Sequence, residues 1–178
     1  IIVGDGGIGC AHIVDGKLHR GFHGGAGEIS HTTVFWPDGR ETERPCSCGK
    51  RGCLDTVSSL QAIRSMAQQR GLPGSPAELE MLARDGHADA LRILPTAGGA
   101  MGLAVAQLVQ LFDPSQVVVM LDQPFGDGVF GAVLRQTMET KVMPRPDWET
   151  TLTLRETQHT DWATGAAGIA TRQFLFSE

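Results

Sequence analysis

The sequence predicts a mixed α/β fold, in which helices lie on the faces of a central sheet. Three observations support this prediction. Short apolar or β-branched segments recur within residues 1–36, helical spacing of apolar residues recurs within 54–112, and a strand–helix–strand–helix alternation follows from 117 onward. A chain of 178 residues suits one domain of this kind.

The first part of the chain carries the strand signals. Ile1–Val3 and Ile8–Val14 are apolar, and Asp15-Gly16 is a two-residue hairpin signal from which Lys17–Arg20 returns. Thr32–Trp36 is β-branched and aromatic, which favours another strand. The chain opens directly on an apolar strand without an initiator methionine, so we expect a fragment of a longer polypeptide.

Apolar spacing predicts helices in the middle of the chain. One helix is expected over 54–69, and a second over Ser75–Arg84, where serine is the N-cap and proline and glutamate follow at their preferred positions. A third begins at His87 and is expected to break or kink at Pro95. Ala97–Phe112 is a long, nearly all-apolar helix.

Strands and helices are expected to alternate in the last part of the chain, from residue 117 onward. We expect a buried strand over Val117–Leu121, a helix over 127–140, a strand over 150–155 and a closing helix over 161–175. Asp161 can cap the closing helix. Its apolar stripe needs a partner: another chain, a part of the protein outside this sequence, or the domain's own sheet. The stripe consists of Ala163, Ala166, Ala167, Ala170 and Phe174.

Composition excludes several classes of protein. Apolar residues make up 41%, so a core can form, and 15 Lys and Arg against 20 Asp and Glu give a net charge of −5. Such a balance argues against nucleic-acid binding by this segment itself, because phosphate binding needs clustered cations. No run of 18 apolar residues is present, so we expect no membrane span.

Three cysteines fall within a polar loop as Cys46-x-Cys48-Gly-x-x-Gly-Cys53. Nothing marks the chain as secreted, so we expect a cytoplasmic protein with reduced thiols. Three convergent thiolates favour a structural zinc site, whose fourth ligand is expected to be His31, at the tip of the preceding strand. The alternative is a loop of unliganded cysteines. Cys10, alone on an apolar strand, is expected to be a small buried residue.

Glu28 and His31 follow directly after the glycine-rich segment 21–27. A carboxylate and an imidazole at this spacing can hydrogen-bond neighbouring hydroxyl groups of a ligand. If one ring nitrogen of His31 binds zinc, the metal orients the other. The alternative is a solvated carboxylate and a surface histidine.

These motifs together resemble the ROK family (repressors, open reading frames and kinases). The resemblance rests on Gly7-Ile-Gly9, on Asp15-Gly-Lys-Leu18, on Gly24-Gly-Ala-Gly-Glu-Ile-x-His31, and on the cysteine motif followed by Leu54-Asp55. It is nearly continuous over residues 1–60 and moderate over 97–121.

The resemblance implies an actin/hexokinase-like (ribonuclease H-like) fold of two lobes around a sugar cleft. Residues 1–178 would form the C-terminal lobe. His31, Cys46, Cys48 and Cys53 match the zinc ligands of the family, and Glu28, His31 and Asp55 match positions that contact sugar. Gly6, Gly7 and Gly9 match a phosphate-binding loop. The catalytic aspartate of the kinases would lie upstream, so we expect no catalytic residue in this chain.

Three departures from the family pattern favour a sugar-sensing transcriptional regulator over an ATP-dependent sugar kinase. Asp5 places an anion where nucleotide phosphate would bind, so ATP binding is not expected. Gln123-Pro124 stands where the kinases have glycines, and Ser30 replaces the usual glycine before His31. The remaining alternatives are a glucokinase-like or N-acetylmannosamine kinase-like lobe, and a structural module.

The resemblance also implies the partners. We expect a sugar or sugar phosphate as ligand, and DNA only through a helix-turn-helix module outside this chain. We expect a homo-oligomer formed through the helical residues 54–112.

Overall fold

The computed structural model describes residues 1–34, 44–144 and 149–176. A four-stranded sheet lies at its centre in the order β2 (Gly7–Gly9), β1 (Ile2–Gly4), β5 (Gln116–Leu121) and β6 (Thr151–Glu156). β1 and β2 are antiparallel, whereas β1, β5 and β6 run parallel. The predicted mixed sheet is therefore confirmed.

The predicted strand over 8–14 is wrong in its extent. It is divided into β2 and β3 (His12–Val14), and β3 pairs with β4 (Lys17–His19) in a separate hairpin. The division falls where Gly27 approaches the Cys10 carbonyl, so closely that a side chain there would overlap it. The hairpin turn itself is as predicted, since Asp15 and Gly16 have φ values of 50° and 72°.

The predicted strand over Thr32–Trp36 is also wrong. Ile29–His31 forms a short 3₁₀ helix, η1, and Thr33 makes an isolated bridge to Cys53. The backbone of this segment pairs with the cysteine loop, through Val34 N to Gly52 O at 2.9 Å, and not with the sheet. Residues 35 and 36 lie outside the described part of the chain.

The predicted helix over 54–69 is two helices, α1 (Asp55–Ser58) and α2 (Leu60–Gln68). Ser59 separates them because its backbone is extended and its side chain accepts a hydrogen bond from Ala62 N, which caps α2. The helix α3 (Pro76–Arg84) begins as predicted, but the Ser75 side chain makes no cap bond.

The core helix is α4 (Ala90–Phe112), which runs unbroken through Pro95. Of the predicted break or kink at this proline, the break is therefore wrong. Contacts with α1, α2, α3 and α5 (Val129–Lys141) outweigh the hydrogen bond that a proline removes. Among the described helices, α4 alone is long and apolar enough to cross a membrane, but 72% of its apolar window is buried. We therefore assign it to the core. The nearly all-apolar character of 97–112 does not mean burial throughout, since Leu111 is 76% exposed near the end of α4.

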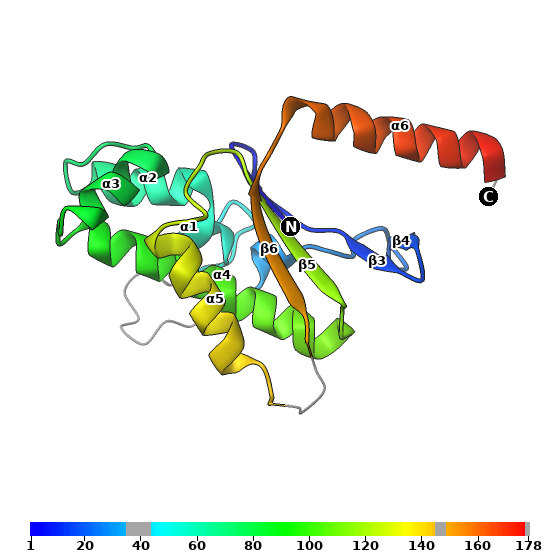
Figure 1. Cartoon of the computed structure of the whole chain (residues 1–178), viewed down its shortest axis with the longest axis horizontal. Helices are drawn as coiled ribbons and strands as arrows, with labels where there is room; N and C mark the ends of the chain where they lie inside the picture. Colours follow the sequence, from blue (N-terminus) through cyan, green and yellow to red (C-terminus); the bar gives the residue numbers. More distant parts are fainter. Residues whose placement is uncertain (35–43, 145–148, 177–178) are drawn as a thin grey trace.

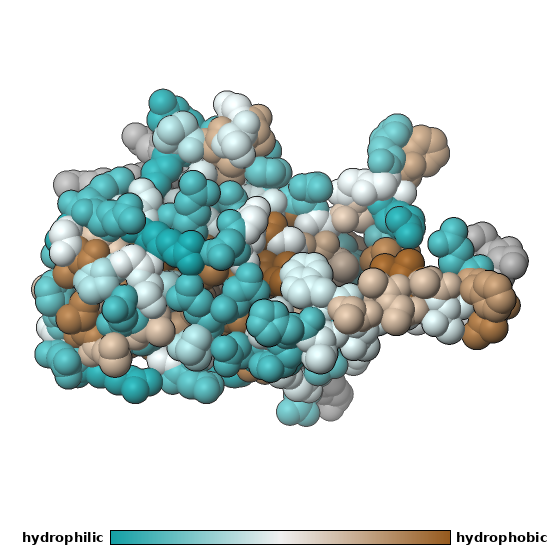
Figure 2. Space-filling model, turned by 90° about the horizontal axis from the view of Figure 1, so that it is seen from above, coloured by the Kyte–Doolittle hydropathy of each residue, from teal (hydrophilic) through white to brown (hydrophobic). Residues whose placement is uncertain are grey.

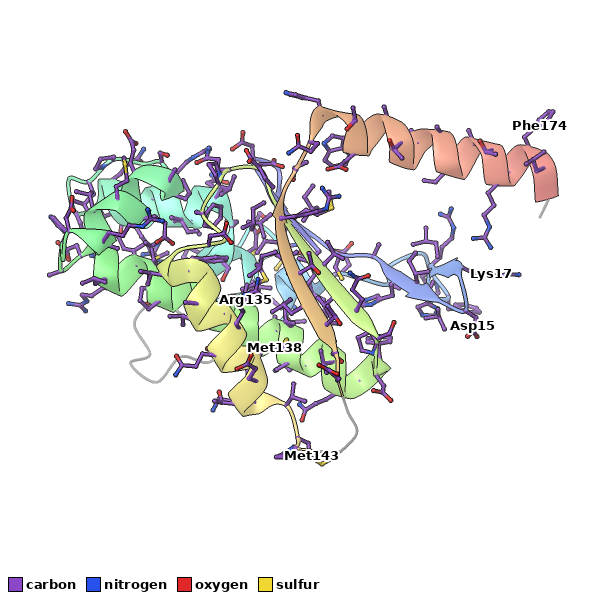
Figure 3. The ribbon with its side chains drawn as sticks, viewed as in Figure 1. Asp15, Lys17, Arg135, Met138, Met143 and Phe174 are labelled. Atoms are coloured by element: carbon purple, nitrogen blue, oxygen red, sulfur yellow. The ribbon has the colours of Figure 1, made fainter. Side chains whose placement is uncertain are left out.

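Helix α5 packs along α4 and also contacts the sheet through β6. Glycines on α4 allow this approach, because a Cβ at Gly98 would overlap the Phe130 carbonyl. Figure 3 shows Arg135 and Met138 on α5. Arg135 Nη1 donates to the Leu152 carbonyl of β6 at 2.9 Å, while Met138 is buried in the core. These contacts fix the helix against both the sheet and α4.

Helix α6 (His159–Phe176) projects from the body on the same side as the β3–β4 hairpin (Figure 1). Every residue from 162 to 175 is exposed, so the expectation that its stripe rests on the domain's own sheet is wrong. Phe174 is 84% exposed at its far end, where apolar side chains gather (Figures 2 and 3). Arg172 Nη1 donates to the Gly16 carbonyl at 2.9 Å, which ties the helix to the hairpin turn.

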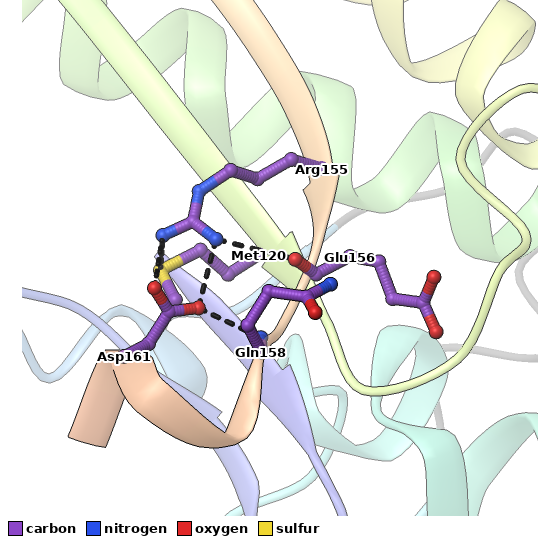
Figure 4. A network of polar contacts seen from close by, with 5 residues as sticks. All are labelled: Met120, Arg155, Glu156, Gln158 and Asp161. Atoms are coloured by element: carbon purple, nitrogen blue, oxygen red, sulfur yellow. Dashed lines mark hydrogen bonds and ion pairs between the residues drawn. The ribbon is translucent and has the colours of Figure 1, made fainter. Parts of the chain in front are cut away.

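A polar network at the start of α6 sets its direction (Figure 4). The Arg155 guanidinium bonds both carboxylate oxygens of Asp161, at 2.8 and 3.0 Å, and its Nη2 lies 3.6 Å from the Met120 sulfur. Asp161 also accepts from Gln158 N at 2.8 Å. The helix begins at His159, earlier than predicted, so Asp161 lies in the first turn. Its carboxylate bonds back to Gln158, the residue that precedes the helix.

Candidate metal centre and ligand site

Four side chains converge beside η1: those of His31, Cys46, Cys48 and Cys53. One donor atom from each lies within 4.8 Å of the donor atoms of the other three. Cys46 Sγ is 3.5 Å from His31 Nδ1, and Cys48 Sγ is 3.6 Å from Cys53 Sγ. Ligands about 2.3 Å from one tetrahedral centre lie roughly 3.8 Å apart, so these distances fit a zinc-like cation.

The backbone of the cysteine loop explains why the sulfur atoms converge. Cys46 N donates to the Lys50 carbonyl at 2.8 Å, and Gly49 N donates to the Cys46 carbonyl at 3.0 Å. Gly49 and Gly52 have φ values of 86° and 68°, which glycine adopts without a steric penalty. The two glycines therefore let the loop curl, as the sequence indicates.

The loop and η1 are tied to each other. Leu54 N donates to the Thr32 carbonyl at 2.9 Å, and Lys50 Nζ donates to the His31 carbonyl at 2.9 Å. With Nδ1 of His31 facing Cys46, its Nε2 remains for a hydrogen bond to a ligand. His31 ends a 3₁₀ helix and not a strand, but it takes the predicted place beside the thiols.

The thiols differ in their environments. Burial raises the pKa of the Cys53 thiol to about 12. A hydrogen bond with the Lys50 backbone lowers the pKa of the exposed Cys48 thiol. A divalent cation removes the difference because coordination deprotonates a thiol outright. The donor set therefore fits a bound zinc ion, which His31 and the three thiolates would hold.

Asp55 joins this cluster to the glycine hairpin of β1 and β2. Its Oδ1 accepts from Ile8 N at 3.2 Å and lies against Gly7, which has a φ of 112°. A polar cavity of about 600 Å³ opens beside Asp55, between the cysteine loop and α2. Its other walls include Arg44, Cys46, Thr56, Ser59, Ser65 and Gln69.

Glu28 precedes η1 and its side chain is exposed. Gly27, with a φ of 100°, brings the loop against the Cys10 carbonyl and so places Glu28 close to the sheet. Both η1 and α1 contact β2. The segments that contain Glu28, His31 and Asp55 therefore all lie near the same strand, β2.

Cys10, which the sequence predicts to be buried, is only half-buried. Its sulfur lies 3.9 Å from His12 Nε2.

The glycine hairpin turns at Asp5 and Gly6, and Gly7 and Gly9 lie in β2. Asp5 Oδ1 pairs with Arg64 Nη1 of α2 at 2.7 Å. Of the predicted phosphate-loop residues, Gly6 thus lies in a tight turn and Gly7 and Gly9 lie in the strand that follows it. The Asp5 carboxylate of the turn pairs with Arg64 at the surface, where their side chains are 72% and 36% exposed. The sequence gives no signal for Arg64, since an arginine on an amphipathic helix is usually solvated.

A family model described as the ROK family matches residues 1–173. The chain belongs to the ROK family. Both regulators and kinases are related to this ROK chain. It is 29% identical over 149 residues to a xylose repressor of Caldicellulosiruptor bescii, and the matched segment covers 76% of this chain and 36% of the repressor. It is 29% identical over 160 residues to a glucokinase of Halalkalibacterium halodurans, with 78% and 46% covered.

The solved structures confirm the actin-like hexokinase fold. A ROK hexokinase from Thermus thermophilus superposes with a TM-score of 0.66 at 27% identity, over 89% of this ROK chain and 52% of the hexokinase chain. The chain spans less than half the length of the two curated relatives named above.

Proposed function

We propose that this ROK domain is the C-terminal lobe of a sugar-responsive transcriptional regulator. The observation that carries this proposal is the pairing of Asp5, in the glycine turn, with Arg64 of α2. A kinase needs such a turn to admit nucleotide phosphate, and here a carboxylate already holds the neighbouring cation. Likeness to a xylose repressor supports the same reading.

In this proposal the sugar site is built from Glu28, His31 and Asp55. The zinc ion is structural: it fixes the orientation of the imidazole, and Cys46, Cys48 and Cys53 complete its ligands. Nε2 of His31 donates to a sugar hydroxyl, while the two carboxylates accept from hydroxyl groups. Gly6 in the turn, and Gly7 and Gly9 in β2, lie in the glycine hairpin and do not bind ATP in this proposal.

The second candidate is the corresponding lobe of a sugar kinase, which likeness to a glucokinase favours. In that case the chain still supplies the zinc ligands and sugar contacts, and the catalytic base comes from outside it. A homo-oligomer formed through residues 54–112, a cytoplasmic location and DNA binding through a separate module belong to the regulator proposal.

The test uses the longest natural polypeptide that contains this chain. Calorimetric titration with xylose and with glucose measures sugar binding, and a mobility-shift assay on DNA upstream of its own gene measures DNA binding. The proposal expects sugar binding that changes DNA affinity, with no sugar-dependent ATP consumption. Phosphorylation of either sugar above background would favour the kinase candidate over the regulator proposal. Absence of all sugar binding would contradict both.

A further inference from the structure

A buried carboxylate occupies the start of α5. Glu80, on α3, is 4% exposed, and its two oxygens accept hydrogen bonds from Val129 N at 2.7 Å and Phe130 N at 2.9 Å. Gly128 makes this possible, because a Cβ there would overlap the Glu80 carboxylate. The contact joins residues about fifty positions apart and caps a helix of 13 residues.

The location matters because α5 connects two parallel strands. Its first residues follow the carboxyl end of β5, and β6 runs beside β5 in the same direction. In open α/β sheets ligands bind outside the carboxyl ends of the strands, and a helix N-terminus there favours anions. Glu80 places its own negative charge at this position.

A cavity of about 250 Å³ remains beside the carboxylate. Two arginines line it: Arg84, one turn after Glu80 on α3, and Arg155, at the end of β6 and paired with Asp161. Guanidinium groups and helix amides are groups that bind phosphate. Asp127 and Glu156 also line the cavity and add negative charge to it. The amides, however, are already satisfied by Glu80.

At the same edge of the sheet a second carboxylate of the chain, that of Asp5, occupies a position where an anionic ligand could bind. Asp5, in the turn after β1, holds Arg64 at 2.7 Å. The two places are neighbours, since Arg64 packs against Gly74, and the next residue, Ser75, donates to Gln123 Oε1 at 3.5 Å. Gln123 in turn lines the cavity beside Glu80. Two carboxylates of the chain therefore occupy neighbouring positions: Glu80 accepts from the helix amides, and Asp5 pairs with Arg64.

We propose that Glu80 is an internal anion that excludes phosphate-bearing ligands from the cavity at the carboxyl ends of β5 and β6, and that Asp5 does the same at Arg64. This inference deepens the proposed function, because a lobe closed to nucleotide phosphate senses sugar without ATP. It concerns Glu80, which takes no part in the sugar site.

The experiment compares Glu80→Ala with Glu78→Ala, a variant of an exposed glutamate on the same helix. The probes are inorganic phosphate and ADP, and binding is followed by phosphorus NMR and by the shift in melting temperature. We expect Glu80→Ala to bind both probes about tenfold more tightly than the wild-type chain, because the helix amides become free. Glu78→Ala should behave as wild type. Equal affinities in a folded Glu80→Ala chain would overturn the proposal.

Removal of Glu80 can also unfold the start of α5. In that case phosphate is expected to restore the helical circular dichroism of Glu80→Ala, and failure of phosphate to do so counts against the proposal. Asp5 is exposed like Asp15, but only Asp5 pairs with Arg64, so Asp5→Asn, with Asp15→Asn as its control, tests the second position by the same phosphate titration. Sugar and DNA binding by the wild-type protein are measured separately, so failure of the regulator proposal is distinguishable from failure of this one.

Discussion

Asp55 Oδ1 accepts a hydrogen bond from the backbone N–H of Ile8 at 3.2 Å, across 47 positions of sequence. Asp55 begins α1 directly after the cysteine loop, and Ile8 lies in the middle of β2. The bond therefore fixes the candidate metal centre relative to the glycine hairpin. A side chain proposed to bind sugar also holds the two halves of the site together.

Asp55→Ala should both destabilise the domain and weaken sugar binding. The variant leaves the N–H of Ile8, a residue only 7% exposed, without its partner. Loss of a buried partner of this kind costs about 1–3 kcal/mol. Urea unfolding measures the free-energy loss. Asp55→Asn keeps an acceptor oxygen and should lose less; equal losses would show that the bond to Ile8 contributes nothing.

Protein purified without added zinc is expected to contain close to one zinc ion per chain. Cys46→Ser and Cys48→Ser should both lower this ratio and the melting temperature, because a structural zinc site contributes directly to folding. Cys10→Ser is the matched control, since its sulfur lies by His12 and outside the cluster. Elemental mass spectrometry of the purified proteins measures the number of zinc ions per chain. A ratio near zero, with freely titrating thiols, would contradict the zinc site.

Gly98→Ala should destabilise the domain by roughly 1–3 kcal/mol, because the added methyl group overlaps the Phe130 carbonyl where α4 meets α5. Gly165→Ala provides the opposite case. Apart from the backbone of α6 itself and the two neighbouring residues, no atom of the described part of the chain lies within 4 Å of the position its methyl group would take. Alanine favours a helix over glycine by about 0.5–1 kcal/mol. Thermal unfolding of both variants checks the prediction. Similar losses at the two positions would argue against the close α4–α5 contact.

The start of α6 should weaken in acid. The Arg155 guanidinium, and then the backbone N–H of Gln158, lower the pKa of Asp161. A lowered pKa contributes stability above the unfolded value, about 3.9 for Asp, and this is lost as pH falls through the folded value. NMR shifts of the first turn of α6 should therefore show a transition below about pH 4 that comes from the Asp161 carboxylate.

Asp161→Asn is expected to abolish that acid transition, and to fray the first turn at neutral pH, since the amide cannot pair with the Arg155 guanidinium as an ion. Asp15→Asn, at the exposed hairpin turn, is the matched control and should leave the transition in place. An unchanged titration of the first turn in Asp161→Asn would show that another group controls it.

Local signals predicted much of the fold correctly. The Asp15-Gly16 turn, the start of α3 at Pro76 and the apolar strand β5 all appear where their residue types place them, because each depends on neighbours in sequence. The errors occur where distant contacts override local preference. Pro95 stays inside α4 because that helix is buried by four others, and Thr33 bridges to Cys53 instead of extending a strand.

By itself the sequence determined the three candidate thiol ligands, because the spacing of Cys46, Cys48 and Cys53 and the two intervening glycines let the loop curl. The bonds from the loop to the segment around His31 complete the cluster. Only the tertiary structure decided the places of Arg64 and Glu80. Each is a charged residue on a helix, which sequence alone reads as solvated. Their partners, Asp5 and the amides at the start of α5, lie far away in sequence and meet them only when the sheet and helices have packed.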